Sequence, residues 1–92
     1  MIAASNAEVD RARSEIEGID RQLVALIAER VRVAREIGRA KRGAGMNTLD
    51  PAREAAVVRR SGELARELGL DDEVVRRIFW QLIALSRSVQ TE

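Results

Sequence analysis

The hydrophobic positions in the first half of the chain recur with the three- and four-residue spacing of an α-helix. Arg30 takes one of these positions, and the others are Val9, Ala12, Ile16, Ile19, Leu23, Leu26, Val33, Ile37 and Ala40. An apolar seam held over several heptads is typical of a long helix that packs against another helix. Ser5 and Glu8 have capping-box spacing, so the sequence predicts a helix that begins at Ser5. The glycines in residues 41–45 suit its C-cap.

Two shorter helices are predicted in the second half. Asp50-Pro51 combines an N-cap aspartate with proline at the first helical position, which is a specific start signal. The predicted buried side of this helix consists of Val57, Val58, Leu64, Ala65 and Leu68. Gly69-Leu70 suits its C-terminus. Asp71 or Asp72 caps the third helix, whose predicted apolar face is Val75, Ile78, Phe79, Leu82, Ile83 and Val89, interrupted by Ser86.

The predicted length of the first helix indicates a dimer. About 36 residues at a rise of 1.5 Å give a helix of about 54 Å. A compact monomer of this size has a radius of gyration of only about 12 Å. Two short helices cannot cover the seam, so a second copy of the chain is expected to do so. The predicted fold class is all-α, with one long and two shorter helices per chain.

Composition narrows the partners and the compartment. Residues 1–92 are enough for one domain, and 16 basic against 15 acidic residues give no long-range attraction to nucleic acid. Phosphate binding through Arg39, Lys41 and Arg42 is disfavoured, because no helix-turn-helix accompanies them. No apolar run is long enough for a membrane span or a signal-peptide core, so a soluble, cytoplasmic protein is expected.

The chemistry open to an enzyme with this composition is narrow. The chain has no cysteine, histidine or tyrosine. A disulfide framework, a thiolate metal site and the commonest acid/base group near neutral pH are therefore excluded. Catalysis would have to rely mainly on positioning and electrostatics, and no metal or cofactor is expected.

Several polar residues do not suit a plain helical bundle. Arg30 lies on the seam, where a guanidinium needs a partner, so a structural ion pair and a ligand site both stay open. Lys41 follows eleven residues later and returns to within about 20° of the same face. Arg13 lies about 25 Å from Arg30 along the helix, so it can reach such a site only from a second chain. Ordinary solvated charge remains the alternative for Lys41 and Arg13.

The other two helices add similar candidates. Arg53 and Glu54 follow the Asp50-Pro51 start, where surface charge is the simple explanation. Ser86 and Gln90 lie one turn apart on or beside the apolar face, where they serve either packing or a ligand.

Taken together, these stretches resemble the all-helical chorismate mutases. The resemblance runs from about Arg13 to Gln90. It is carried by residues 13–20, 26–30, 37–41 and 50–54, together with Ser86 and Gln90, in matching order and spacing. It implies a single chorismate mutase domain over residues 1–92, an intertwined homodimer, and the rearrangement of chorismate to prephenate in phenylalanine and tyrosine biosynthesis without a cofactor.

The resemblance also implies a role for each site residue. Arg30 and the partner chain's Arg13 would bind the two substrate carboxylates, and Lys41 and Gln90 would donate to the ether oxygen. Glu54 would accept from the ring hydroxyl, with Asp50 on the same side. Arg53 and Ser86 would add contacts to the ring and a carboxylate. Catalysis would then depend on Lys41, Gln90, Arg30 and Glu54.

Three alternatives remain at this stage. Relatives on the same fold act on isochorismate as pyruvate lyases or on 4-amino-4-deoxychorismate as mutases, but they often lack the acid at Glu54. A non-catalytic helical dimerisation module would require carboxylates on the seam, and the seam has none.

The segment Met46-Asn47-Thr48 departs from the family pattern, so substrate closure can differ. Regulation by a partner enzyme is also left open.

Overall fold

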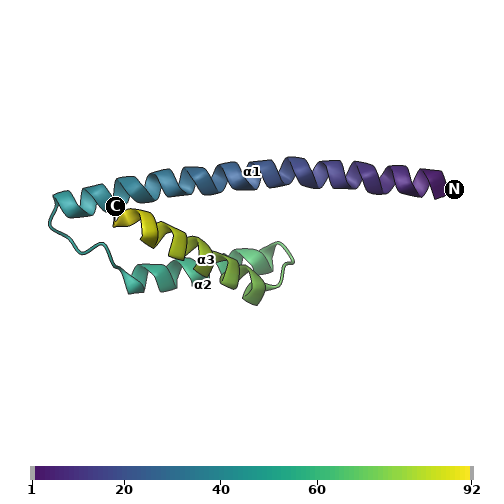
Figure 1. The fold of residues 1–92 in the computed structure, drawn as a ribbon. Coiled ribbons are helices and arrows are strands. Elements are labelled where there is room, and N and C mark those ends of the chain that lie inside the picture. The colour runs from purple at the N-terminus through teal and green to yellow at the C-terminus, as the bar shows by residue number, and fades with distance from the viewer. Residues whose placement is uncertain (1, 92) are drawn as a thin grey trace.

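The computed structural model describes the backbone of residues 2–91 and the side chains of residues 5–91, and this part of the chain is all-α. The three helices are α1 (Ile2–Gly43), α2 (Pro51–Glu67) and α3 (Asp72–Gln90). Helix α3 packs against both α1 and α2 and lies between them (Figure 1). The prediction of one long and two shorter helices is confirmed. Within the described residues, no helix has the length and apolar character needed to cross a membrane.

The predicted start of the first helix at Ser5 is wrong. Helix α1 is already formed at Ile2 and runs through Ser5 without a break. Residues 3 and 4 are both alanine, the strongest helix former, so the helix continues upstream of the capping-box spacing. Helix α1 is therefore 42 residues long rather than about 36.

The predicted helix ends are confirmed by backbone hydrogen bonds. At the end of α1, Gly45 adopts a φ of 69° and the Met46 N–H donates to the Lys41 carbonyl at 2.8 Å. This arrangement satisfies the last carbonyl groups of the helix, and the positive φ favours glycine. After α2, the Leu70 N–H donates to the Ala65 carbonyl at 2.8 Å, in the same pattern.

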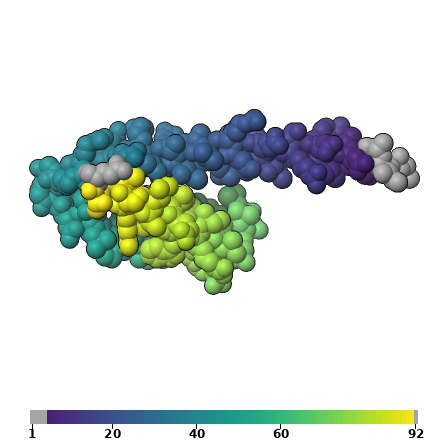
Figure 2. Space-filling view, viewed as in Figure 1, coloured from purple at the N-terminus to yellow at the C-terminus, as the bar shows by residue number. Residues whose placement is uncertain are grey.

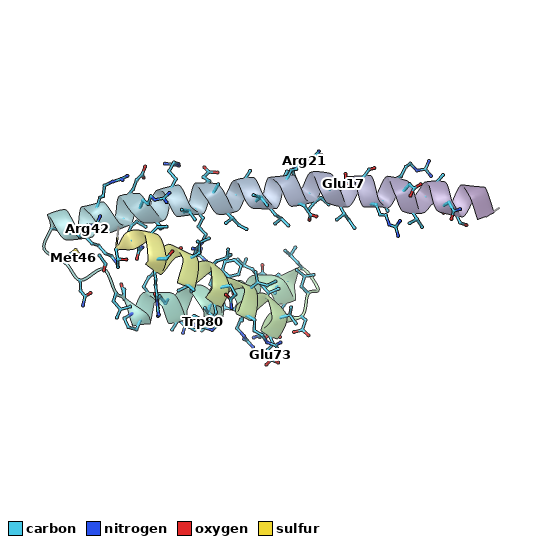
Figure 3. The ribbon with its side chains drawn as sticks, viewed as in Figure 1. Glu17, Arg21, Arg42, Met46, Glu73 and Trp80 are labelled. Carbon is cyan, nitrogen blue, oxygen red and sulfur yellow. The ribbon has the colours of Figure 1, made fainter. Side chains whose placement is uncertain are left out.

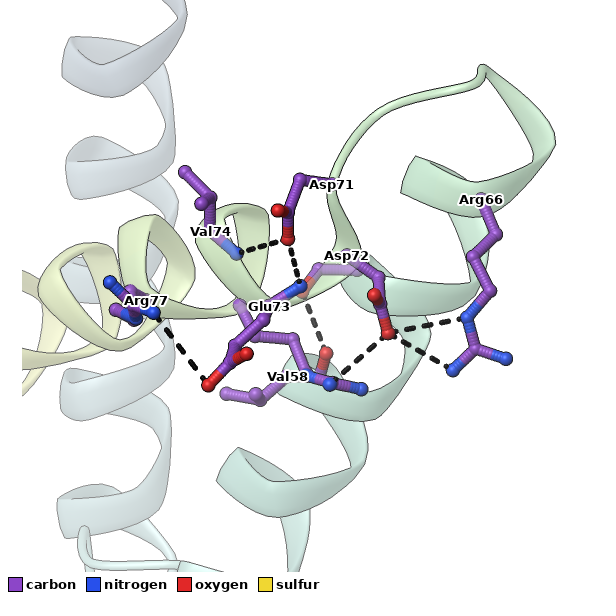
Figure 4. Close-up of polar contacts among 9 residues, drawn as sticks. Val58, Arg66, Asp71, Asp72, Glu73, Val74 and Arg77 are labelled. Carbon is purple, nitrogen blue, oxygen red and sulfur yellow. Dashed lines mark hydrogen bonds and ion pairs between the residues drawn. The ribbon is translucent and has the colours of Figure 1, made fainter.

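Aspartate side chains cap the two shorter helices. The Asp50 carboxylate accepts from the Arg53 N–H at 3.1 Å, with Pro51 at the first helical position as predicted. Of the two candidates for α3, Asp71 is the N-cap, and it accepts from the N–H groups of Glu73 and Val74 at 3.0 and 3.2 Å (Figure 4). These caps fix where α2 and α3 begin.

The hydrophobic core of one chain is small. Its buried apolar residues are Ala34, Val58, Ala65, Ile83 and Val89. Within a single chain, Leu64, Leu68 and Ile78 are 50%, 76% and 53% exposed, so their predicted burial would require a second chain. On α2 the buried stripe consists of Val58, Ser61, Gly62 and Ala65, which are small enough for close packing, and the two leucines lie beside it.

The N-terminal part of α1 extends beyond the other helices (Figure 1). At 1.5 Å per residue the whole of α1 is about 63 Å long, and the longest dimension of the molecule is 65 Å. The radius of gyration is 17.9 Å, against about 12 Å for a compact chain of this length. In Figure 2, the N-terminal half of α1 projects from the body formed by the other elements. The helix therefore extends past its own domain, as its predicted length suggested.

The seam of α1 is largely uncovered. Its larger members are 39–61% exposed, and they are Val9, Ile16, Ile19, Leu23, Leu26, Val33 and Ile37. By contrast, Arg21 projects from α1 on the side away from α2 and α3 (Figure 3). Soluble chains rarely leave an apolar stripe of this length in water, so the seam has the character of an interface.

Candidate active site

A cavity of about 450 Å³ lies where the C-terminal half of α1 meets the start of α2 and the end of α3. It contains every site residue predicted from the sequence except Arg13: Arg30, Lys41, Asp50, Arg53, Glu54, Ser86 and Gln90. Its apolar walls are Val33, Ala34, Ile37, Val57 and Ile83. The cavity therefore combines charged side chains with apolar walls, as small-molecule sites do.

Arg30 is half-buried in this cavity and is bound by uncharged groups. Its guanidinium donates to the Ser86 hydroxyl at 2.5 Å and to the Leu82 carbonyl at 3.5 Å. Ser86 in turn donates to the Leu82 carbonyl at 3.1 Å, which holds its oxygen toward Arg30. These neutral partners orient Arg30 but do not neutralise it, so an anionic ligand would be a favourable addition.

Lys41 lies three turns further along α1 and lines the same cavity, as the spacing predicts. Its ammonium group is half-buried and donates to the backbone carbonyl of Thr48 at 3.3 Å. Thr48 belongs to the atypical loop, in which Met46 is exposed (Figure 3). A lysine held by a single neutral acceptor keeps two further protons for a ligand.

Glu54 is bound by a residue that the sequence analysis missed. The Arg87 Nε donates to Glu54 Oε2 at 2.7 Å, and its Nη2 donates to the other carboxylate oxygen. Hydrogen bonding from Arg87 lowers the pKa of Glu54, and the charges of Arg87 and Lys41 act in the same direction. The pKa of Arg87 is raised in return. Glu54 is therefore an ionised acceptor with a fixed orientation.

Close packing of α3 against α1 fixes the position of Gln90. A Cβ atom at Gly38 would lie 2.6 Å from the Gln90 carbonyl oxygen and 2.8 Å from its Cα. The Arg42 guanidinium also donates to this carbonyl. Glycine at position 38 thus allows the C-terminal end of α3 to approach α1, which leaves the half-buried Gln90 side chain at the cavity.

We expect Gly38→Ala to destabilise the protein by about 1–3 kcal/mol, because both opposing atoms are backbone and cannot rotate away. Gly43→Ala is the matched control in the same helix, since its Cβ would meet nothing within 4 Å. That change should stabilise by up to about 1 kcal/mol. Chemical denaturation of both variants tests the difference. Equal stability of the two would contradict the close approach.

Arg13 is the one predicted site residue that the structure does not bring to the cavity. It lies on the exposed N-terminal half of α1, 17 residues before Arg30. That separation is about 25 Å along the helix axis. Within a single chain, Arg13 and Arg30 therefore cannot contact the same small molecule.

The fold and cavity define an all-helical protein with fixed cations around a cavity of small-molecule size. Among the described residues, no group of three or more acidic side chains is arranged to hold a metal. The chain belongs to the type II chorismate mutase family, whose model matches residues 12–91.

The chain is similar to individual proteins over different shares of their length. The chain is 31% identical to a chorismate mutase of Methanocaldococcus jannaschii over 87% of this chain and 81% of the relative. It is 37% identical to an intracellular chorismate mutase of Mycobacterium tuberculosis over 62% of this chain and 54% of that protein. It is also 29% identical to a 3-dehydroquinate dehydratase of Pyrobaculum aerophilum, covering 97% of this chain but 26% of the relative. No solved structure gives a significant match.

Proposed function

We propose that the cavity is the site at which the chain, as a chorismate mutase, rearranges chorismate to prephenate. The observation that carries the assignment of the site is the convergence of Arg30, Lys41 and Gln90 on one cavity of suitable volume. Family membership supports the activity. In this role the protein is an isomerase of aromatic amino acid biosynthesis.

The reaction suits a chain without histidine, cysteine or tyrosine. It is pericyclic: one C–O bond breaks while one C–C bond forms, and neither proton transfer nor a covalent intermediate is required. The protein must hold a flexible dianion in a chair-like shape and stabilise negative charge that grows on the ether oxygen. Fixed cations and amide donors can do both.

Different residues of the cavity hold the substrate and stabilise the charge on its ether oxygen. Arg30, oriented by Ser86, binds a substrate carboxylate through its planar guanidinium. Lys41 and Gln90 donate to the ether oxygen, where charge develops only in the transition state. This difference between the ground state and the transition state is the source of catalysis.

The start of α2 binds the ring side of the substrate. Glu54 accepts from the ring hydroxyl, and Arg53 contacts the ring region or a carboxylate. Asp50 lines the same side, but its carboxylate already accepts from the Arg53 N–H as the helix cap. We therefore expect Asp50 to act mainly by fixing the start of α2.

A second copy of the chain completes the site by supplying Arg13. In an antiparallel α1 pair, placing the partner's Arg13 level with Arg30 puts the two-fold axis midway between these positions. That midpoint falls within about one residue of the centre of α1, which runs from Ile2 to Gly43. This single register therefore brings a partner Arg13 to each of the two sites. It also lays the exposed seams of the two α1 helices against each other over nearly their whole length. We propose an intertwined homodimer on this basis.

The remaining assignments follow from the substrate and the charge. We propose that the protein acts in the cytoplasm on chorismate as a free metabolite. Its net charge of +1 gives no general attraction to nucleic acid or anionic lipid. We also propose that a partner enzyme that binds the dimer can regulate it.

The direct test is to incubate the purified protein with chorismate, follow the loss of ultraviolet absorbance, and identify the product. Conversion to prephenate supports the proposal. Isochorismate and 4-amino-4-deoxychorismate are assayed in parallel, because relatives on this fold use them. If the protein converts one of these two compounds and leaves chorismate unchanged, that compound is the substrate in place of chorismate. Inactivity on all three compounds would refute an enzymatic role.

A further inference from the structure

We propose that Arg87 is a positioning residue that sets the specificity of the ring side of the cavity. By binding both oxygens of Glu54, Arg87 makes this end select a substrate hydroxyl over an ammonium group. The inference rests on the function proposed above. It explains how the site can distinguish chorismate from its 4-amino analogue, which differs in this one group.

The contact between Arg87 and Glu54 has the geometry of a specific pair. It joins the C-terminal half of α3 to the first turn of α2, and the guanidinium approaches the carboxylate with two nitrogen atoms. The Glu54 side chain is 14% exposed and that of Arg87 is 52% exposed. A two-point contact restricts carboxylate rotation, which a single hydrogen bond would not.

The charges that face Glu54 come from each surrounding element. Arg87 lies on α3, Lys41 on α1, and Asp50 immediately before α2. Arg30 and Arg53 line the same cavity. Within one chain these four cations and two carboxylates leave a net charge of +2, and the partner's Arg13 would raise it to +3 in the proposed dimer. Without Arg87 each of these charges would fall by one, and Glu54 would lose the partner that binds both of its oxygens.

This arrangement favours a neutral hydrogen-bond donor. A carboxylate offers about four acceptor positions, so Glu54 can still accept from a hydroxyl while bound to Arg87. An ammonium group would bring a positive charge close to the Arg87 guanidinium and be repelled. It would also gain less from Glu54, whose charge Arg87 already compensates. The pair therefore discriminates by charge, whereas the hydrogen-bonding geometry accepts both groups.

The pair also keeps Glu54 ionised in mild acid. Because Arg87 lowers the pKa of Glu54, the acceptor form persists below the usual carboxyl range and is lost only as the pH falls through the lowered pKa. Replacing Arg87 by glutamine should return the Glu54 pKa toward its ordinary value. The acid limb of the kcat/KM profile should then move to higher pH.

Three variants separate charge from positioning. We expect Arg87→Gln to lower kcat/KM for chorismate by about three- to tenfold, mainly through KM, since partly exposed ion pairs are individually modest. Its preference for chorismate over 4-amino-4-deoxychorismate should fall by about tenfold or more. Arg87→Lys retains the charge without the two-point contact, so it should keep most of the preference while KM rises. Arg77→Gln removes an equally charged, exposed residue of α3 that pairs with Glu73, and it should match wild type.

A second readout does not depend on turnover. The ¹³C chemical shift of the Glu54 carboxyl carbon, assigned with Glu54→Gln, is titrated in wild type and in Arg87→Gln, with folding checked by circular dichroism. A higher Glu54 pKa in Arg87→Gln supports the proposal. An unchanged titration, or an unchanged substrate preference, would overturn the role of Arg87. A wild-type protein inactive on chorismate would instead refute the proposed function, and the selectivity with it, even if the titration shifts.

Discussion

Replacing Lys41 by alanine should lower kcat for chorismate by about 10²- to 10³-fold, the loss typical when one donor to a developing oxyanion is removed. KM should change only a few-fold, because the ether oxygen carries little charge in the ground state. Among the residues whose side chains the structure describes, Lys41 donates only to the Thr48 carbonyl. Its removal therefore breaks no ion pair with any of these residues. Steady-state kinetics on chorismate test this expectation.

A neighbouring cation provides the matched control for Lys41. Arg39 is exposed on the same helix and does not line the cavity, so Arg39→Ala should retain nearly full activity. If Lys41→Ala raised KM with kcat unchanged, Lys41 would contribute substrate binding rather than transition-state stabilisation. Equal losses in both variants would point to general electrostatic attraction, which salt would then weaken.

Mixing two inactive variants should restore activity if each site uses both chains. Arg13→Ala and Arg30→Ala should each lose about 10²-fold or more, because a substrate carboxylate then lacks its guanidinium partner. In a mixed dimer, one site receives both substitutions and the other receives neither. Random re-pairing of equal amounts should therefore recover about a quarter of wild-type activity. Unfolding and refolding the mixture, followed by assay on chorismate, measures this fraction.

The same design includes its own control. Arg30 and Lys41 line the cavity of one chain. Mixing Arg30→Ala with Lys41→Ala leaves every mixed dimer with one defect in each site, so activity should not return. Recovery in this control would indicate sites that are not shared as proposed. A failure of the Arg13 and Arg30 mixture, with the mixed dimer shown by mass, would remove Arg13 from the site.

The sequence predicted those parts of the fold that depend on local chemistry. Asp50-Pro51, Gly45 and Gly69-Leu70 act through bonds within one turn of the chain, and each helix boundary they predict is found. The start at Ser5 failed because a capping-box spacing also occurs inside helices when strong helix formers precede it. Periodicity identifies an apolar side of α2 without choosing the stripe that meets α3, so it did not show that Leu64 and Leu68 stay exposed in a single chain.

The candidate site was predicted through residues that break a pattern or match the family. Arg30 interrupts a seam, and Lys41 returns to its face by simple helical geometry. Arg87 gave no such signal, since charged residues are common on α3 and Glu54 lies 33 residues away in the sequence. The close approach of Gln90 to Gly38 could not be predicted from the sequence either, because it depends on how closely α3 packs onto α1. Contacts between helices therefore required the three-dimensional structure.

The uncovered seam of α1 also bears on the fate of newly made chains. Only five apolar residues are buried among the described side chains, whereas seven large residues of the seam remain in contact with water. A chain that meets no second copy would therefore open readily and offer its long helix to proteases. At low expression, degradation of single chains would compete with their assembly into dimers. The amount of intact enzyme would then rise more steeply than the rate of synthesis. Cellular chorismate mutase capacity would thus depend on subunit supply as well as on catalytic rate.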